Sequence, residues 1–163
     1  MKKPLVALML TFLAASVFPE SFISQVGRFS VTTPVTLTEE QQEVNGTFTM
    51  YEFYGYSEEN TLYLITYMDY PRELVATKGL LKQLGDQLLD DIDKKAVVVL
   101  DMTPTVEGAP ERAIVARVYD GRSVLQSRFI IIKSRVYNIV TINDQGKDSD
   151  EVTEFIDTFK VER

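Results

Sequence analysis

The sequence predicts a single α/β domain, and two observations support that prediction. Residues 113–142 hold three apolar, β-rich segments joined by two very short connections, which is the pattern of an antiparallel meander. Residues 71–93 and 151–159 instead place their large apolar side chains at helical spacing. The 163 residues, 45% of them hydrophobic, are enough for one domain with its own core.

The N-terminus has the layout of a secretory signal peptide. Residues 1–3 are basic at two positions, and residues 5–18 are an apolar run with small side chains at residues 14–16. The run is short for a membrane span, which needs about 20 residues. We therefore expect residues 1–21 to be a signal peptide, cut after Ala15 or Ser16 or somewhat later. The alternatives are an uncleaved anchor or a buried helix.

Residues 22–163 then form the expected domain, which begins with strands. Residues 27–31 predict a short strand, which the Thr33-Pro34 pair ends. Residues 38–43 are polar and acidic and predict a loop or an edge strand. Residues 47–54 are rich in Thr, Phe and Tyr, which predicts a strand. Residues 61–67 predict another strand, and because they carry Leu, Ile and Tyr on both strand faces we expect partial cover on each side.

Residues 71–93 predict an amphipathic helix with a leucine stripe. Pro71 is acceptable at a first helical position and Thr77 is an alternative N-cap, so two starting points remain open. Gly85 weakens the helix and indicates close packing on the sheet. Residues 96–100 (AVVVL) are an unbroken apolar run, which predicts a buried strand.

A loop over residues 103–110 precedes the meander. In the meander, Asp120-Gly121 is the dipeptide that a two-residue hairpin turn favours, and Lys133-Ser134 is a weaker turn. Residues 129–132 (FIII) are apolar on both strand faces. We therefore expect Ile130 and Ile131 to point in opposite directions and both to be buried in a central strand.

The composition excludes much chemistry. The chain has no Cys, so it has no disulfide, thiolate metal site or cysteine nucleophile, and it has no His for Ser-His pairs, HExxH zinc sites or ordinary haem ligation. We find no catalytic motif, and we expect a protein that is not an enzyme and needs no cofactor. The net charge of −7 argues against nucleic-acid binding.

Several short segments together resemble the PsbP-like family of small exported domains. They are residues 27–31 (GRFSV) with Pro34, the loop 108–112 (GAPER), residues 135–137 (RVY) in the last meander strand, and the final helix 154–159 (EFIDTF). The resemblance spans roughly residues 22–161.

The resemblance implies an α/β/α three-layer sandwich with a central, mostly antiparallel sheet. It also implies a non-enzymatic role, because the namesake is an extrinsic luminal subunit of photosystem II. A nuclear Ran-binding protein shares the fold, so fold alone does not decide function. Metal-binding His residues proposed in that group have no counterpart here, which puts a metal role and a true photosystem II role in doubt.

The leading hypothesis is an exported domain, in the periplasm, thylakoid lumen or extracellular space, that binds another protein or supports a membrane complex. We expect it to be a monomer with no stable membrane span after signal cleavage. Its candidate partner surface is basic and consists of Arg117, Arg122, Arg128, Lys133 and Arg135. The alternative for these cations is that they solvate the sheet and protect its edges.

The competing hypothesis is a small-molecule or Ca²⁺-binding periplasmic module. Asp86, Asp90 and Asp93 share one helical face, and residues 143–154 are rich in carboxylates. The simpler interpretations are a solvated helix face and a loop followed by a helix cap. The eight tyrosines could line a ligand cleft, although they would more often pack half-buried on a sheet.

Overall fold

The computed structural model describes residues 19–44, 48–106, 109–144 and 150–162. They form a mixed α+β fold with mostly antiparallel sheets, as expected. The helices are α1 (Lys78–Ile92) and α2 (Asp150–Thr158). The strands are β1 (Glu20–Ser24), β2 (Phe29–Thr33), β3 (Thr38–Val44), β4 (Phe48–Tyr56), β5 (Leu62–Asp69), β6 (Val97–Met102), β7 (Thr105–Val106), β8 (Ala109–Pro110), β9 (Arg112–Val118), β10 (Ser123–Ile132), β11 (Arg135–Asp144) and β12 (Lys160–Val161).

The main sheet has seven strands in the order β3-β4-β5-β11-β10-β9-β6, and each neighbouring pair is antiparallel. A second sheet has the order β1-β2-β12, and β7 pairs with β8 in a short hairpin within the predicted loop 103–110. The predicted meander is therefore confirmed as β9-β10-β11, and it forms the middle of the main sheet rather than its edge.

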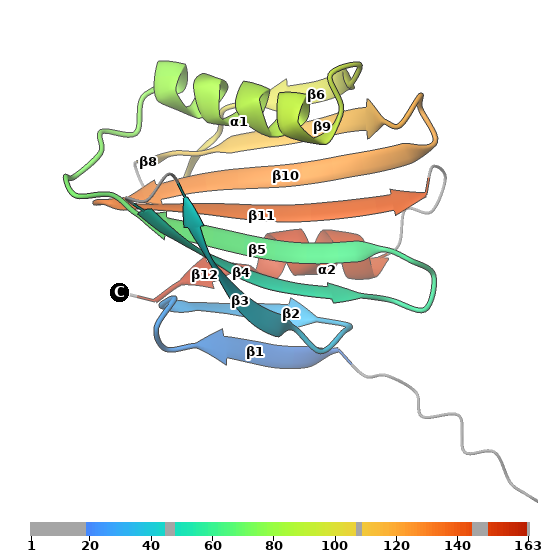
Figure 1. Cartoon of the computed structure of the whole chain (residues 1–163), viewed down its shortest axis with the longest axis horizontal. Helices are drawn as coiled ribbons and strands as arrows, with labels where there is room; N and C mark the ends of the chain where they lie inside the picture. The colour runs from blue at the N-terminus through green and yellow to red at the C-terminus, as the bar shows by residue number, and fades with distance from the viewer. Residues whose placement is uncertain (1–18, 45–47, 107–108, 145–149, 163) are drawn as a thin grey trace, which may run out of the picture.

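The main sheet is covered on both faces, but by different elements. The helix α1 packs on β9 and β10, while α2 packs on β2 and β11 from the opposite side. Figure 1 shows α1 in front of the sheet and α2 behind it, with the β1-β2-β12 sheet next to α2. The second outer layer thus combines a helix with a small sheet. The three-layer α/β/α arrangement implied by the family resemblance stays a prediction.

Two hydrophobic clusters fill the space on the two faces. The cluster on the α2 face gathers Phe29 and Val31 from β2, aromatic and aliphatic residues of the main sheet, and residues of α2. The cluster on the α1 face joins Leu81 and Leu89 of α1 to β9, β10 and β11. The main sheet therefore separates two hydrophobic cores and contributes side chains to both. This explains why its central strands are apolar on both faces.

Ile130 and Ile131 show this division within one strand. Ile130 belongs to the cluster on the α2 face and is 6% exposed, whereas Ile131 belongs to the cluster on the α1 face and is 5% exposed. The strand β10 lies between β11 and β9. The expectation that both side chains are buried on opposite sides of a central strand is confirmed.

The helix α1 starts later than the first of its two predicted starts. Thr77 is its N-cap, and its side chain accepts a hydrogen bond from the Leu80 amide at 3.2 Å. Residues 71–77 are not helical, because the chain there is tied to the β10–β11 turn. The amides of Tyr70 and Leu74 donate to the carbonyls of Ser134 and Lys133 at 2.7 and 2.8 Å.

The β9–β10 connection is longer than the predicted two-residue turn. The last pair is Val118 with Ser123, so four residues form the loop. Tyr119 and Asp120 take the positive φ angles of a type I′ turn, and Gly121 follows with φ 79°. The two-residue hairpin lies instead at residues 133–134, because Ile132 pairs with Arg135. Lys133 accepts a φ of 54° there without being glycine.

The predicted boundary between residues 21 and 22 falls within β1, which pairs with β2 from Glu20 onward. Residues 1–18 lie outside the described residues. At the other end, the short strand predicted around Val161 is present as β12, paired with β2.

Replacing Gly85 with alanine should destabilise the protein, although alanine favours helix by about 1 kcal/mol over glycine. A Cβ at Gly85 would overlap the guanidinium of Arg112 and the Cδ1 of Ile114. Arg112 cannot easily move, since it donates to Asp101, Asp86 and the α1 backbone. We expect a net loss of about 1–2 kcal/mol in the free energy of unfolding, measured by urea denaturation.

The matched control is the other glycine of α1. At Gly79 the nearest atom to an added Cβ is Thr77 Oγ1 at 3.9 Å, so there is room for a methyl group. Gly79→Ala should therefore stabilise the protein by up to about 1 kcal/mol. If both variants were stabilised alike, α1 would not approach the sheet as closely at Gly85 as described.

Candidate functional site

The strand β6 is the largest departure from the sequence-based expectation. Residues 96–100 were expected to be a buried strand, but β6 forms one edge of the main sheet and every residue in it is exposed. Its apolar side chains are 41–61% exposed and comprise Val97, Val98, Val99, Leu100 and Met102. Large exposed apolar patches of this kind commonly mark interaction sites.

Pairing with β9 gathers part of this apolar surface on one face of the sheet. Val97 lies opposite Arg117, Leu100 opposite Val115, and Met102 opposite Ala113. Directly opposite residues in an antiparallel pair project to the same face. We call the group Val97, Leu100, Met102, Val115 and Arg117 the β6–β9 surface.

The β6–β9 surface lies on the same side of the sheet as α2, beyond the part that α2 covers. Ala113 of β9 pairs with Arg128 of β10, and the Arg128 guanidinium donates to the Ile156 carbonyl of α2 at 3.2 Å. The helix therefore reaches the sheet at β10. Val97, Leu100 and Met102 stay exposed on β6, the second strand beyond this contact.

The structure separates the five cations of the predicted basic surface. Arg117 lies within the β6–β9 surface, and Arg122 lies nearby in the β9–β10 loop, where it donates to the Tyr119 carbonyl at 3.0 Å. Lys133 and Arg135 lie at the opposite end of β10 and β11. Of these five cations, Arg117 and Arg122 are the two exposed ones that lie together, at the end of the β9–β10 pair next to the β9–β10 loop.

Arg128 and Arg135 are engaged inside the protein. Arg128 donates to Glu111 at 2.7 Å, and both side chains are largely buried. Arg135 donates twice to Asp69 at 2.6 Å and also to the carbonyls of Val26 and Gly27. The paired Asp69 carboxylate raises the pKa of Arg135. Both arginines therefore connect elements of the fold. This structural role explains their presence without a partner protein.

The acidic face of α1 also has internal roles. Asp86 accepts from Lys82 at 2.5 Å and from Arg112 at 3.1 Å, and these contacts lower the pKa of Asp86. Asp93 accepts from the amides of Lys95 and Tyr119. Among residues 19–44, 48–106, 109–144 and 150–162, no three Asp or Glu side chains are grouped so that they could hold a metal ion.

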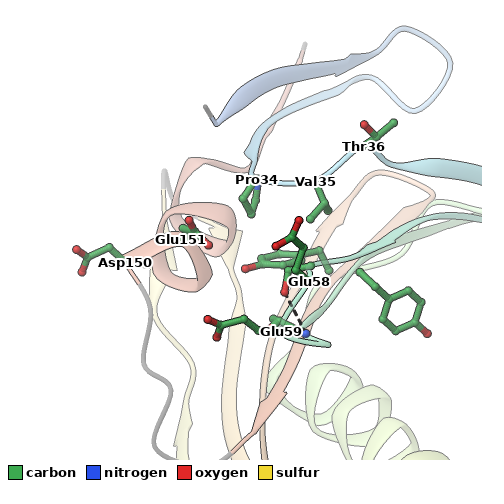
Figure 2. Close-up of a pocket in the computed structure, with 11 residues that line it drawn as sticks. Pro34, Val35, Thr36, Glu58, Glu59, Asp150 and Glu151 are labelled. Atoms are coloured by element: carbon green, nitrogen blue, oxygen red, sulfur yellow. Dashed lines mark hydrogen bonds between the residues drawn. The ribbon is translucent and has the colours of Figure 1, made fainter. Parts of the chain in front are cut away.

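The second predicted acidic segment borders a pocket of about 820 Å³ between α2 and the β4–β5 turn. Four carboxylates line it, namely Glu58, Glu59, Asp150 and Glu151. Figure 2 shows these side chains pointing in different directions, with Asp150 turned away from the others. Part of the predicted segment, residues 145–149, lies outside the described residues.

A smaller groove of about 340 Å³ runs beside α1 on the other face of the sheet. Its lining is mainly apolar and includes Phe48, Met50, Met68 and Leu88. Asn138 is the buried polar side chain at its base, where it accepts a hydrogen bond from Ser127 at 2.7 Å. Tyr67 and Tyr70, two of the eight tyrosines, are also among the groove's lining residues. Tyr63, Tyr67 and Tyr137 are core residues, and burial raises the pKa of Tyr67 to about 12.

No protein-family model matches the chain, and no curated protein matches it. A crystal structure from Bacteroides thetaiotaomicron VPI-5482, solved at 1.50 Å resolution, is similar with a TM-score of 0.46 and 15% identity. The match covers 89% of this chain but 49% of that chain, so this chain spans about half its length. Within the described part of the chain, no helix is long and apolar enough to cross a bilayer.

Arg117 and Arg122 were predictable as part of a binding surface, but the apolar part of the β6–β9 surface was not. An unbroken run of β-branched residues has the same pattern whether the strand is central or at an edge. One signal was present in the sequence: the run is bounded by Lys94-Lys95 and by Asp101. Charges at the ends of an apolar strand are typical of segments that need protection from aggregation.

Proposed function

We propose that this protein is an exported, non-catalytic domain that acts by binding another protein, and that the β6–β9 surface is where the partner docks. The observation that carries this proposal is the exposure of Val97, Leu100 and Met102 on a sheet face that no described element covers. Burying such side chains contributes about 25 cal/mol per Å² of apolar area. The partner therefore needs an apolar patch of its own.

The charges around the surface favour a partner with acidic groups at its rim. Arg117 is exposed within the surface and Arg122 is exposed in the adjacent loop. Lys95 also lies at this end, with its ammonium 3.9 Å from Asp120. Rim charges of one sign accelerate association and select register more than they add affinity. An envelope protein or a membrane complex with an acidic docking face fits this arrangement.

The family and compartment remain part of the same proposal. The antiparallel α+β fold, with α1 and α2 on opposite faces of one sheet, supports a PsbP-like domain and its α/β/α layering. The basic start and apolar run of residues 1–18 support a signal peptide. Because β1 pairs from Glu20 onward, we propose cleavage at or before residue 19, which favours Ala15 or Ser16.

Affinity capture from the envelope of the producing cell, at near-physiological salt, tests the proposed function. The key variant is Val115→Glu, because Val115 lies in the surface and belongs to neither core cluster. We expect the wild-type protein to retain a defined partner and Val115→Glu to lose at least about 90% of it, since a buried unpaired charge is costly.

The control variant is Val75→Glu, which makes the same change at a valine that is 78% exposed before α1. It should retain the partner as well as the wild type does. Equal retention by Val115→Glu and the wild type would remove the β6–β9 surface from the proposal. Recovery of no partner by any of the three proteins would count against protein binding as the function.

A further inference from the structure

The main sheet has two edges, and their sequences differ in a way that matters for pairing. The edge strand β3 reads TEEQQEV, with Glu39, Glu40 and Glu43 all exposed. Charged side chains along an edge discourage another strand from adding to it. The opposite edge strand, β6, reads VVVLDM and has a single charge. One edge is thus protected against strand addition and the other is not.

The features that protect an edge strand are nearly absent from β6. It contains no Pro, Lys or Arg, and its five apolar side chains are all exposed. Its single irregularity is a bulge, where the register with β9 shifts between Val98 and Leu100. Within the described residues, no strand lies on its outer side. An exposed apolar edge of this kind pairs with another strand or aggregates.

The order of charges along β6 makes it complementary to itself. Lys94 and Lys95 precede the apolar run, and Asp101 follows it. An antiparallel pairing of two copies centred on Val98 places Lys95 of one copy beside Asp101 of the other, twice. The Lys95 side chain is 81% exposed, with its ammonium 3.9 Å from Asp120. The Asp101 side chain is 42% exposed and accepts from Arg112 through both oxygens, and its exposed side leaves room for a second cation. Pairing β6 of one copy with the acidic β3 edge of another lacks this reciprocal match of charges. It would also be a head-to-tail contact, which does not form a closed dimer.

We propose that two copies of this protein associate across a two-fold axis through antiparallel pairing of β6 with β6, which joins their main sheets into one. Strand pairing about a two-fold axis is self-complementary, since each copy contributes the same edge. The twist that accompanies a bulge limits the pairing to a short stretch. This proposed association differs from the monomer expected from the sequence.

The dimer goes beyond the proposed function and uses different groups. Strand pairing uses the backbone edge of β6 and Val98, which lies opposite Ala116 on the face of α1. Partner binding uses the opposite face. A two-fold axis perpendicular to the joined sheet places the two β6–β9 surfaces next to each other on one side, which doubles the area available to the partner.

Sedimentation velocity over a wide concentration range tests the dimer with charge variants at Val98. We expect the wild-type protein to sediment as a dimer. Val98→Lys and Val98→Glu should each halve the sedimenting mass, because the two-fold axis brings like charges together. An equimolar mixture of the two variants should restore the dimer, because opposite charges then meet. Val75→Lys serves as the control and should remain a dimer.

A wild-type monomer at all concentrations, an unchanged dimer for Val98→Lys, or assemblies that grow beyond two copies would each overturn the inference. Far-ultraviolet circular dichroism and thermal melts check that the variants fold, which we expect because Val98 is 44% exposed. The two proposals fail separately. Loss of the dimer without loss of capture removes only the two-fold pairing, whereas a dimer that captures no partner removes only the proposed function.

Discussion

Replacing either Ile130 or Ile131 with alanine should lower the free energy of unfolding by about 2–5 kcal/mol. The two side chains lie on opposite faces of β10, and each is at most 6% exposed. Each deletion therefore leaves a cavity in a different core. A loss of this size is a large fraction of the 5–15 kcal/mol typical of a domain, and urea denaturation of the single variants measures it.

The losses of stability in the two variants show whether both faces of β10 are buried. Similar large losses mean that both faces of the sheet are covered and dry. If one variant were nearly neutral, one face of β10 would be in contact with water, and the two-core arrangement would be wrong. Val75→Ala, at a valine 78% exposed, is the control and should change the stability by less than about 0.5 kcal/mol.

Replacing Phe29 with alanine should cost about 3–5 kcal/mol, because Phe29 joins the small sheet to the main one. Its side chain is fully buried. The ring centroid lies 5.2 Å from those of Phe53 and Phe159, edge-on to the first and stacked on the second. Phe53 belongs to β4 and Phe159 follows α2, so one side chain contacts both layers. The loss appears as a lower midpoint in urea denaturation.

Phe22 provides a control for the loss of stability expected from Phe29→Ala. Phe22 of β1 packs at the edge of the same cluster and is only partly buried, with its centroid 6.0 Å from that of Phe29. Phe22→Ala should therefore cost clearly less than Phe29→Ala. If Phe29→Ala cost under about 1 kcal/mol, the β1-β2-β12 sheet would be a peripheral element rather than part of the core.

The candidate site was only partly predictable. The sequence shows that Arg117, Arg122, Arg128, Lys133 and Arg135 crowd the meander, but it does not show that Arg128 and Arg135 bind Glu111 and Asp69. Arg135 and Asp69 are far apart in the chain and meet because β11 pairs with β5. An ion pair across neighbouring strands depends on strand order, which no local pattern contains.

The local structure and the excluded chemistry follow from the order of the amino acids alone. The β-rich composition of residues 61–67, the turn residues of the meander and the leucine spacing of α1 are properties of neighbouring residues. They therefore predict strands and helices without the tertiary structure. The absence of His and Cys needs no structure at all.

Which apolar strand is covered depends on the strand order of the assembled sheet. The runs VVVL in β6 and FIII in β10 are equivalent as patterns, yet Phe129, Ile130 and Ile131 of β10 are buried and β6 is an exposed edge. Strand order is set by pairing between residues that are far apart in the chain. That pairing depends on the loops that connect the strands and on the packing of both hydrophobic cores. The exposure of β6, on which both proposals depend, is therefore a property of the assembled sheet.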